Sequence, residues 1–478
     1  MMDLAVAAVE GALAAGARYA DARVMVIRHE SMAARNRVVE ELAQDENAGV
    51  GVRALIGSSW GFSATPTLTA AAAREAGQGA AAVAKASALV PGPPLDLSAA
   101  PVVVDRWSST WVEHPLDDVS PADKAELLVA ATGAAADVGV PLAQASYVAW
   151  DTEKWFASSE GSRIEQHIVE CGGVVEATAV GDGETQRRSY PGILGQHGTQ
   201  GWELVRGLDL VGNAALMAEQ ALALLSAPRC PEGTTTVVLD SDQVGLQIHE
   251  SVGHAVELDR ILGWEAAFAG TSWLDPARLG ELRFGSELMQ ITADATLPGA
   301  MGSFGYDDEG VAAQAVDIVK DGRWVGVLSG RDSAPVVGLA SGGMVRADGP
   351  ARLPMVRMTN VGLLPGESSL EEMIAGTEDG IFMQTNRSWS IDDKRLNFQF
   401  GCEIGWEIKD GVLGRMVRNP TYTGIGPTFW GSLDAVGGGD EWTVWGVPHC
   451  GKGQPLQVGH TGHHAAPCRF RDVRVGVR

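Results

Sequence analysis

His249-Glu250-Ser251-Val252-Gly253-His254 is the stretch of sequence from which the rest of the chain is best read. Two imidazoles flank a carboxylate, and these are the parts of a zinc hydrolase. Neutral histidine nitrogens bind Zn²⁺, and a glutamate beside the ion can take a proton from zinc-bound water. In the common form of such a motif, H-E-x-x-H, the histidines lie at positions i and i+4 on one face of a helix. This stretch contains one residue more.

The extra residue changes the geometry of the motif. At roughly 100° per residue, positions i and i+5 lie about 140° apart on a regular α-helix. Both histidines can therefore reach one ion only if the turn between them is widened, as in a π-bulge. Gly253 stands in the insertion, where a residue without Cβ tolerates unusual backbone angles. The spacing alone also fits a buried core helix in which two histidines happen to occur.

Composition and charge narrow the class of protein. A chain of 478 residues exceeds one ordinary domain and predicts two or three. The 60 glycines predict many turns and a large β component. A net charge of −24 argues against nucleic acid and against an anionic membrane as partners. The N-terminus lacks the basic region of a signal peptide and no apolar run approaches the length of a membrane span, so we expect a cytoplasmic protein.

The order of predicted elements indicates an α+β protein with two domains. Ala-rich helices and strands in the first half predict an α/β N-terminal domain over residues 1–228. A Gly-rich second half with short apolar runs predicts a β-rich C-terminal domain over residues 229–478, with the motif helix embedded in it. The boundary rests on a local shift in composition at residues 227–233.

Turn signals divide the strands of the first half. We expect strands over residues 19–28 and 31–42, and an antiparallel meander between residues 143 and 180, with Gly172-Gly173 as one of its turns. Two glycine patterns imitate other enzymes. Residues 49–54 match a dinucleotide-binding G-x-G-x-x-A and residues 57–61 match a G-x-S-x-G nucleophile elbow, but neither precedes a plausible helix start. A Gly-rich strand and a hairpin turn are the better interpretations.

A third ligand is needed, because a catalytic zinc ion usually has three protein ligands and one open position. The five cysteines are too far apart for a disulfide framework, so each could be a free thiol. Cys450 stands in a tight Gly-rich turn that could present a thiolate, although a lone cysteine is more often a small buried apolar residue. Glu371-Glu372 is a distant alternative whose neighbours look like an ordinary amphipathic helix. Apart from this glutamate pair, the candidates for the third ligand are Glu257, Asp259, Cys402, Cys450, His460, His463, His464 and Cys468.

Several further blocks of sequence are together far more specific than the histidine motif alone. They are Asp307-Asp308-Glu309-Gly310, Arg357-Met358-Thr359-Asn360 with Leu364-Pro365-Gly366, Cys450-Gly451-Lys452-Gly453-Gln454, and the N-terminal stretch from Gly51-Val52-Arg53 to Gly61-Phe62. In order and spacing, together with the histidine motif, they resemble the TldD/PmbA family of metalloproteases. The likeness spans nearly the whole chain, and it is closer to the metal-bearing TldD branch than to the metal-free partner branch.

The resemblance implies a site and an assembly. It implies that zinc is held by His249, His254 and Cys450, with Glu250 as the catalytic carboxylate. It also implies a dimer, either a homodimer or a heterodimer with a PmbA/TldE-like subunit, whose cavity admits unfolded peptides as extended strands. The His-rich segment over residues 459–468 looks unlike the family, which leaves additional metal binding near Cys450 open.

From these points we expect a zinc metallopeptidase that hydrolyses peptide bonds in unfolded proteins or peptides, with Glu250 as general base. Two alternatives use the same residues. One is an amidohydrolase that acts on a small peptide-like metabolite, and the other is a catalytically silent subunit that holds peptides for a partner. The intact set of three ligands and a glutamate argues against the silent subunit, which would not need all four.

Overall fold

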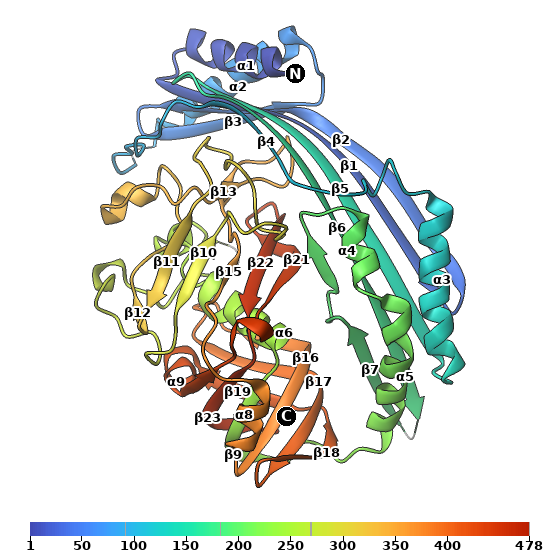
Figure 1. The fold of residues 1–478 in the computed structure, drawn as a ribbon. Helices are drawn as coiled ribbons and strands as arrows, with labels where there is room; N and C mark the ends of the chain where they lie inside the picture. The colour runs from blue at the N-terminus through green and yellow to red at the C-terminus, as the bar shows by residue number, and fades with distance from the viewer. Residues whose placement is uncertain (91, 182, 268–269, 478) are drawn as a thin grey trace.

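The computed structural model describes residues 1–90, 92–181, 183–267 and 270–477. A long, curved sheet from the N-terminal half arches over the C-terminal half, which lies against its concave side (Figure 1). The fold class predicted from the sequence is confirmed: an α/β N-terminal half is followed by a β-rich half that carries the motif helix.

The N-terminal sheet has the order β3-β2-β1-β5-β6-β4, and β7 and β8 also pair with β6. All pairings are antiparallel except that of β4 with β6. The strands are β1 (Tyr19–Arg35), β2 (Val38–Ile56), β3 (Ser59–Thr65), β4 (Val104–Ser108), β5 (Leu142–Ser158), β6 (Arg163–Gly181), β7 (Glu184–Tyr190) and β8 (Gln196–Gly198).

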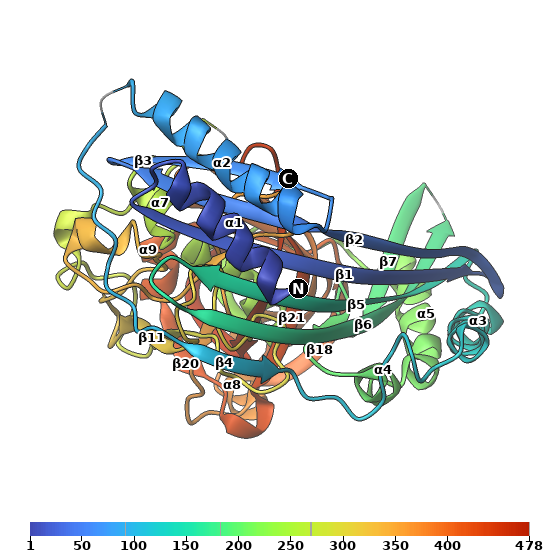
Figure 2. The ribbon, with the colours of Figure 1, turned by 90° about the horizontal axis from the view of Figure 1, so that it is seen from above.

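Helices cover one face of this sheet, and the C-terminal half covers the other. Because side chains alternate along a strand, Ala22 and Ala34 of β1 pack beneath the helices, whereas Arg23 and Met25 point toward the C-terminal half. Figure 2 shows α1 and α2 lying across the long strands, with α3 and α5 near their far end. The helices are α1 (Met2–Ala14), α2 (Ala70–Ser87), α3 (Pro121–Asp137), α4 (Trp202–Gly207) and α5 (Leu210–Ser226).

Two predicted turns in this sheet were wrong. The first hairpin turns at Asn36 and Arg37, which both have positive φ, so β1 continues through the break expected near residue 29. Gly172 lies inside the continuous strand β6, where a Cβ atom would come within 2.2 Å of the Gln196 carbonyl oxygen. This glycine therefore permits close approach of β8 rather than a turn. The two enzyme-like glycine patterns fall within β2 and at the β2–β3 hairpin, and no helix follows them directly.

The C-terminal half contains a seven-stranded sheet of order β16-β9-β23-β19-β17-β18, with β20 paired to β23, and a four-stranded sheet of order β12-β11-β10-β15. Two ribbons, β13–β14 and β21–β22, complete it. The strands are β9 (Gly233–Leu239), β10 (Ile291–Asp294), β11 (Ala315–Lys320), β12 (Arg323–Trp324), β13 (Val345–Arg346), β14 (Met355–Val356), β15 (Val361–Leu363), β16 (Asp379–Ile391), β17 (Asn397–Lys409), β18 (Val412–Arg418), β19 (Thr421–Ile425), β20 (Leu433–Val436), β21 (Thr443–Lys452), β22 (Gln457–Ala465) and β23 (Cys468–Val475).

The motif helix follows β9 directly and is buried in this half. Val244, Ile248 and Val252 on its apolar side belong to the main core cluster. The helical elements are α6 (Ser241–Ile248), the π-helical turn η1 (His249–Gly253), α7 (Leu258–Ile261), η2 (Pro276–Arg278), η3 (Ala334–Val337), α8 (Leu370–Ala375), α9 (Gly426–Gly431) and η4 (Gly439–Glu441). The predicted boundary after residue 228 falls between α5 and β9, and it stays a prediction.

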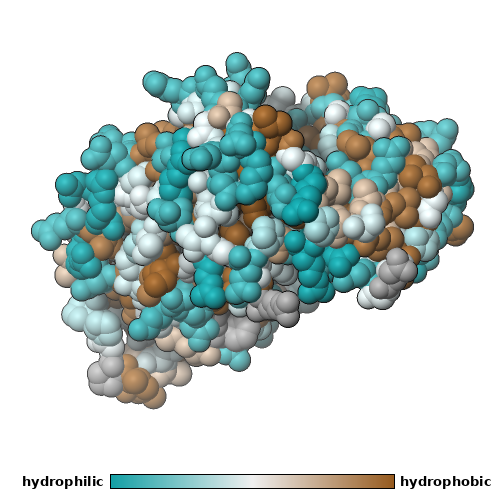
Figure 3. All heavy atoms as spheres, turned by 90° about the horizontal axis from the view of Figure 1, so that it is seen from below, coloured by the Kyte–Doolittle hydropathy of each residue, from teal (hydrophilic) through white to brown (hydrophobic). Residues whose placement is uncertain are grey.

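The surface is mixed in polarity, and the cysteines are not paired in disulfides. Figure 3 shows hydrophilic and hydrophobic residues interspersed over the face seen from below. All five cysteines are buried and free. In the part of the chain that the structure describes, no helix has the length and apolar character needed to cross a membrane.

Buried ion pairs join the two halves. Asp308 accepts from Arg23 at 3.0 Å and from Lys154 at 2.6 Å, and Glu309 accepts from Arg53 at 3.1 Å. Burial alone would raise the pKa of Asp308, but the Lys154 and Arg23 charges outweigh it and hold this pKa well below its ordinary value. The acidic block at residues 307–309 thus fastens the C-terminal half to the concave face of the sheet.

Replacing Asp308 with Asn should destabilise the protein by about 3–5 kcal/mol at neutral pH, because two buried cations lose their partner. The depressed pKa means that this contribution is complete above the unfolded pKa of Asp and fades as the pH falls below it. Urea unfolding should therefore show a gap between wild type and variant that narrows in acid. Asp137→Asn, which removes an exposed partner of Arg37, should cost much less. Equal losses for the two variants would contradict the assignment.

Candidate metal centre

The histidine motif starts as a regular helix and then widens. Asp240 caps α6 by accepting from the Ser241 amide at 2.8 Å. The chain then enters η1, where the His254 amide donates to the His249 carbonyl at 3.2 Å, an i to i+5 bond. The two imidazole centroids lie 4.9 Å apart. The widened turn predicted from the spacing is confirmed, and it brings both histidines to one side of the helix.

Gly253 has a different role from the one predicted. Its φ is not in the left-handed region. A Cβ atom at this position would lie 2.1 Å from Sδ of Met358. The glycine is therefore needed for close packing against residue 358, which belongs to one of the sequence blocks noted above, and not for an unusual backbone angle.

Cys450 joins the two histidines. One ligand atom from each of His249, His254 and Cys450 lies within 4.8 Å of the others, and all three side chains are buried. Sγ of Cys450 is 3.7 Å from Nε2 of His254. Burial raises the pKa of the Cys450 thiol, but the neighbouring His254 side chain and the Arg357 charge outweigh it, and the net shift is downward. The cluster could hold a metal ion with two imidazoles and a thiolate.

The strand that carries Cys450 is held from the other half of the protein. The Gln196 side chain donates to the Val444 carbonyl at 2.6 Å and accepts from the Gly446 amide at 2.8 Å. Gln196 belongs to β8, and Val444 and Gly446 belong to β21. The position of the third candidate ligand thus depends on the N-terminal sheet.

His463 fixes the tautomer of His249. Nδ1 of His463 lies 2.8 Å from the Val361 carbonyl oxygen, which can only accept, so this nitrogen carries the proton. Nε2 of a neutral His463 is then an acceptor, and it lies 2.7 Å from Nδ1 of His249. Nδ1 of His249 therefore donates, and its Nε2 keeps a free lone pair. Burial lowers the pKa of both imidazoles, which keeps them neutral.

Glu257 fixes the tautomer of His254. Its carboxylate lies 2.9 Å from Nδ1 of His254, so that nitrogen donates and Nε2 is again left free. Lys452 lies 3.3 Å from Glu257 and holds the carboxylate in its charged form. Burial raises the pKa of Glu257, but the Lys452 charge and the hydrogen bond from His254 outweigh it, and the pKa falls well below its ordinary value. Both histidines thus present Nε2 to the same space.

Glu250 faces a cavity of about 440 Å³ that the three candidate ligands also line. Its Oε2 accepts from Arg395 at 2.7 Å. Arg395 stands in the turn between β16 and β17 with a positive φ of 62°. This ion pair joins the motif to a hairpin more than a hundred residues away in sequence.

The other predicted candidates have different surroundings. Asp259 pairs with Lys452 at 2.8 Å, His460 with Glu170 at 2.8 Å, and His464 with Thr292 at 3.1 Å. Cys402 and Cys468 are buried in β17 and β23. Glu372 closes a capping box on α8 with Ser369, and Glu371 is exposed on the same helix. The tail histidine His463 reaches the site, but as a partner of His249.

Sequence reasoning overlooked three roles here. Glu257 follows His254 by three residues, a spacing that brings side chains together on a helix and could have indicated its role. The sequence presents His463 only as a candidate ligand, because its hydrogen bond to His249 depends on the contact between β15 and β22. Arg395 has no local signal, because only the tertiary fold brings the β16–β17 turn to Glu250.

A second group of potential ligands, His114, Asp151 and His167, lies on the helix side of the N-terminal sheet. Nδ1 of His114 accepts from the amides of Leu116 and Asp117 at 3.3 and 3.2 Å, so its proton is on Nε2, which faces Asp151. Arg28 also donates to Asp151. Asp151 is thus already engaged by His114, His167 and Arg28, so the group fits a structural ion-pair network better.

Three family models match the chain. They are PmbA/TldA metallopeptidase domain 1 over residues 20–88, the central domain over residues 114–225, and the C-terminal domain over residues 232–476. A metalloprotease of Methanocaldococcus jannaschii is 31% identical over 93% of this chain and 94% of its own length. A metalloprotease TldD homolog of Haemophilus influenzae is 29% identical over 92% and 90%. A zinc metalloprotease TldD homolog of Saccharolobus solfataricus is 26% identical over 51% and 52%.

Two solved structures share the fold. A putative modulator of a DNA gyrase from Thermotoga maritima superposes with a TM-score of 0.77 at 16% identity and covers 99% of both chains. TldE from Thermococcus kodakarensis gives a TM-score of 0.73 at 15% identity and covers 98% of this chain and 99% of its own.

Replacing Cys450 with Ala should abolish stoichiometric zinc, because it removes one of the three candidate ligands. Cys468→Ala is the matched control, since it also removes a buried free thiol but leaves the cluster intact. Metal analysis of the purified proteins distinguishes the two. Zinc retained by the Cys450 variant and lost from the Cys468 variant would place the third ligand in the tail.

Replacing His463 with Leu should weaken zinc binding by roughly 10- to 100-fold without abolishing it, because His249 loses the partner that fixes its tautomer. Competition against a chelating dye measures the affinity, and thermal melting checks that the variant is folded. His464→Leu removes a neighbouring buried imidazole that contacts Thr292 instead, and should bind zinc nearly as the wild type does. If the two variants bind zinc equally well, His463 does not orient His249.

Proposed function

Because this chain belongs to the PmbA/TldD family of metallopeptidases, we propose that it is a zinc-dependent enzyme that hydrolyses peptide bonds in unfolded proteins or peptides. The observation that carries the proposal is the common cavity of His249, His254, Cys450 and Glu250. The name of the Saccharolobus solfataricus relative supports zinc as the metal.

The donor set fits zinc. Two neutral imidazoles with free Nε2 atoms and one thiolate are ligands that zinc accepts, and Glu257 and His463 supply the outer hydrogen bonds that such ligands usually have. When bound, zinc would supply Lewis-acid chemistry, by activating a water molecule and polarising the scissile carbonyl. His249, His254 and Cys450 would hold it beside the cavity that they line.

Glu250 is the residue that accepts and then donates the proton in this reaction. Its Oε2 is engaged by Arg395, so Oε1 is the oxygen that would take a proton from the attacking water. The same carboxyl group would then deliver this proton to the departing amine. Arg395 orients the Glu250 carboxylate, and its positive charge would stabilise a negative charge that develops beside Glu250 during the reaction.

Two alternatives use the same cavity. A silent peptide-binding subunit would not need both the ligand set and Glu250, and their joint presence favours an active enzyme. Hydrolysis of an amide in a small peptide-like metabolite would need the same residues, and substrate trapping with a Glu250→Ala variant would distinguish it by the molecule retained. We further propose a dimer, with a second copy or with a PmbA/TldE-like subunit, and a cytoplasmic location, with which the free thiols are consistent.

Zinc-loaded protein should cleave denatured casein, and Glu250→Gln should reduce the rate by at least 10²-fold, because it removes the general base while keeping the size of the side chain. Gel electrophoresis of the digest measures cleavage. Glu371→Gln is the matched control, since this glutamate is exposed on α8, and it should cleave as the wild type does.

Equal cleavage by the wild type and the Glu250 variant would contradict the assigned base. If neither cleaves, the assay is repeated with a PmbA/TldE-like partner added, and continued inactivity favours the small-metabolite alternative.

A further inference from the structure

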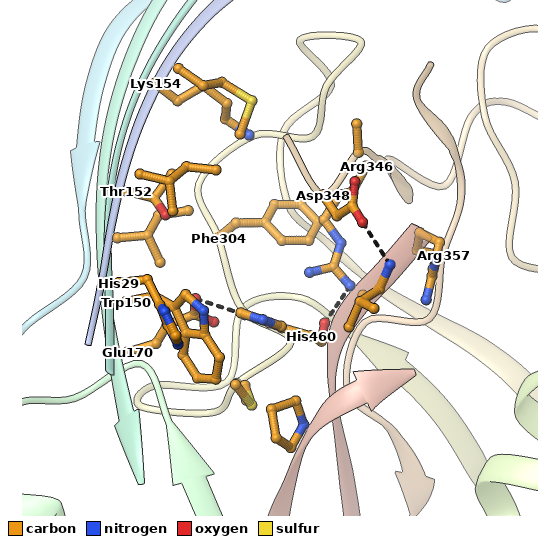
Figure 4. Close-up of a pocket in the computed structure, with 18 of the residues that line it drawn as sticks. His29, Trp150, Thr152, Lys154, Glu170, Phe304, Arg346, Asp348, Arg357 and His460 are labelled. Carbon is orange, nitrogen blue, oxygen red and sulfur yellow. Dashed lines mark hydrogen bonds and ion pairs between the residues drawn. The ribbon is translucent and has the colours of Figure 1, made fainter. Parts of the chain in front are cut away.

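A second cavity of about 380 Å³ lies between the concave face of the N-terminal sheet and the C-terminal half (Figure 4). Trp150 of β5 stands on its sheet side, and Phe304 and Arg346 come from the C-terminal half. His449 lines both this cavity and the cavity of the candidate metal centre. The two cavities therefore meet at β21, the strand that also carries Cys450.

The carboxylates that line this cavity already have partners. Each is bound by a cationic or potentially cationic side chain of the protein: Asp308 by Arg23 and Lys154, Glu170 by His460 at 2.8 Å, Asp45 by His29 at 2.8 Å, and Asp348 by Arg352 at 3.6 Å. Glu170 and Asp308 act on Arg346 from a longer distance, but among the described residues none of the four carboxylates forms an ion pair with Arg346 or Arg357.

Two arginines of the cavity have only carbonyl partners. Arg346 donates to the carbonyls of Met358 and His460, and Arg357 donates to those of Gln457 and Cys450. Among the described residues, neither has a carboxylate within ion-pair distance, and the buried Nε of each has no hydrogen-bond partner. A cation that is withdrawn from water without a counter-charge is costly, so this cavity is electrostatically suited to an anion.

Arg346 is the more accessible of the two. It is half-buried, whereas Arg357 is 2% exposed. Its guanidinium lies 5.3 Å from the centre of the Phe304 ring, and Figure 4 shows it beside that ring and the backbone of His460. Burial and the Arg357 charge lower the pKa of Arg346 to about 10, so it remains protonated at neutral pH. Exposed Asp45, Val458 and His449 mark the side on which the cavity meets solvent.

We propose that this cavity binds a carboxylate of the peptide substrate at Arg346, which makes Arg346 a specificity-determining residue. The proposal rests on the proposed function, since the ligand is a peptide that also spans the metal cavity. A guanidinium binds a carboxylate through parallel hydrogen bonds, and the aromatic walls would cover the methylene groups next to it. The carboxylate can come from an acidic side chain or from the C-terminus of the peptide.

Binding of fluorescent ten-residue peptides tests this proposal. The zinc-loaded Glu250→Gln protein serves as host, so that the peptides stay intact, and anisotropy gives the Kd. Each peptide with one Glu is compared with its Gln counterpart, and each free C-terminus with its amide. We expect the carboxylate form of one pair to bind roughly 10- to 100-fold more tightly. The pair that responds identifies the source of the carboxylate.

Adding Arg346→Gln should remove this preference, and Arg346→Lys should keep part of it, because the charge remains but the planar fork is lost. Arg418→Gln is the matched control: Arg418 also donates to a backbone carbonyl, that of Leu225, but lines neither cavity. It should leave the preference intact. Circular dichroism checks folding, and if the Gln variant does not fold, the Lys variant and the peptide pairs decide.

Equal affinity for both members of every pair, absence of binding, or a preference that survives Arg346→Gln would overturn the carboxylate site. Casein cleavage by the wild type reports on the proposed function separately, so failure of one does not imply failure of the other.

Discussion

The bond from the His254 amide to the His249 carbonyl is the interaction on which the candidate metal centre depends. A regular helix would point the two imidazoles in different directions, and the i to i+5 bond turns them to the same side. The surrounding core fits this one turn closely. Met358 occupies the space that a side chain at residue 253 would fill, and Val252 is part of the main apolar cluster. The widened turn is thus held by packing as well as by its own hydrogen bond.

Around this turn, His249, His254 and Glu250 are each oriented by a partner outside the motif. His463 comes from β22, Glu257 from the segment after the motif, and Arg395 from the β16–β17 turn. The ion pairs of Asp308 and Glu309 then fix the whole half against the N-terminal sheet. In some proteins, buried ionic groups contribute more to structural specificity than to net stability. By this principle, the pairs of Asp308 and Glu309 set the position of the two halves relative to each other as well as stabilising their contact.

The sequence was informative where chemistry is local. The motif spacing predicted a widened turn, and the Gly-rich second half predicted a β-rich domain. The resemblance indicated His249, His254, Glu250 and Cys450, and the structure brings all four to one cavity. Roles that arise from long-range contacts could not be predicted in this way. Gly172 resembled a turn because its contact with Gln196 is invisible in the sequence, and Arg395 lies beside Glu250 only after the β16–β17 hairpin is placed.

The two hydrogen bonds between the Gln196 side chain and β21 limit how such proteins can diversify. The amide of one residue in the first half bridges two backbone groups of the strand that bears the third candidate ligand. The two halves are therefore expected to evolve together. A chimera that joins the first half of one relative to the second half of another must preserve this bridge, or the thiolate shifts relative to the imidazoles. Recombination within this family should tolerate exchanges at the distal helices α1 and α2 far better than exchanges across the β8–β21 contact.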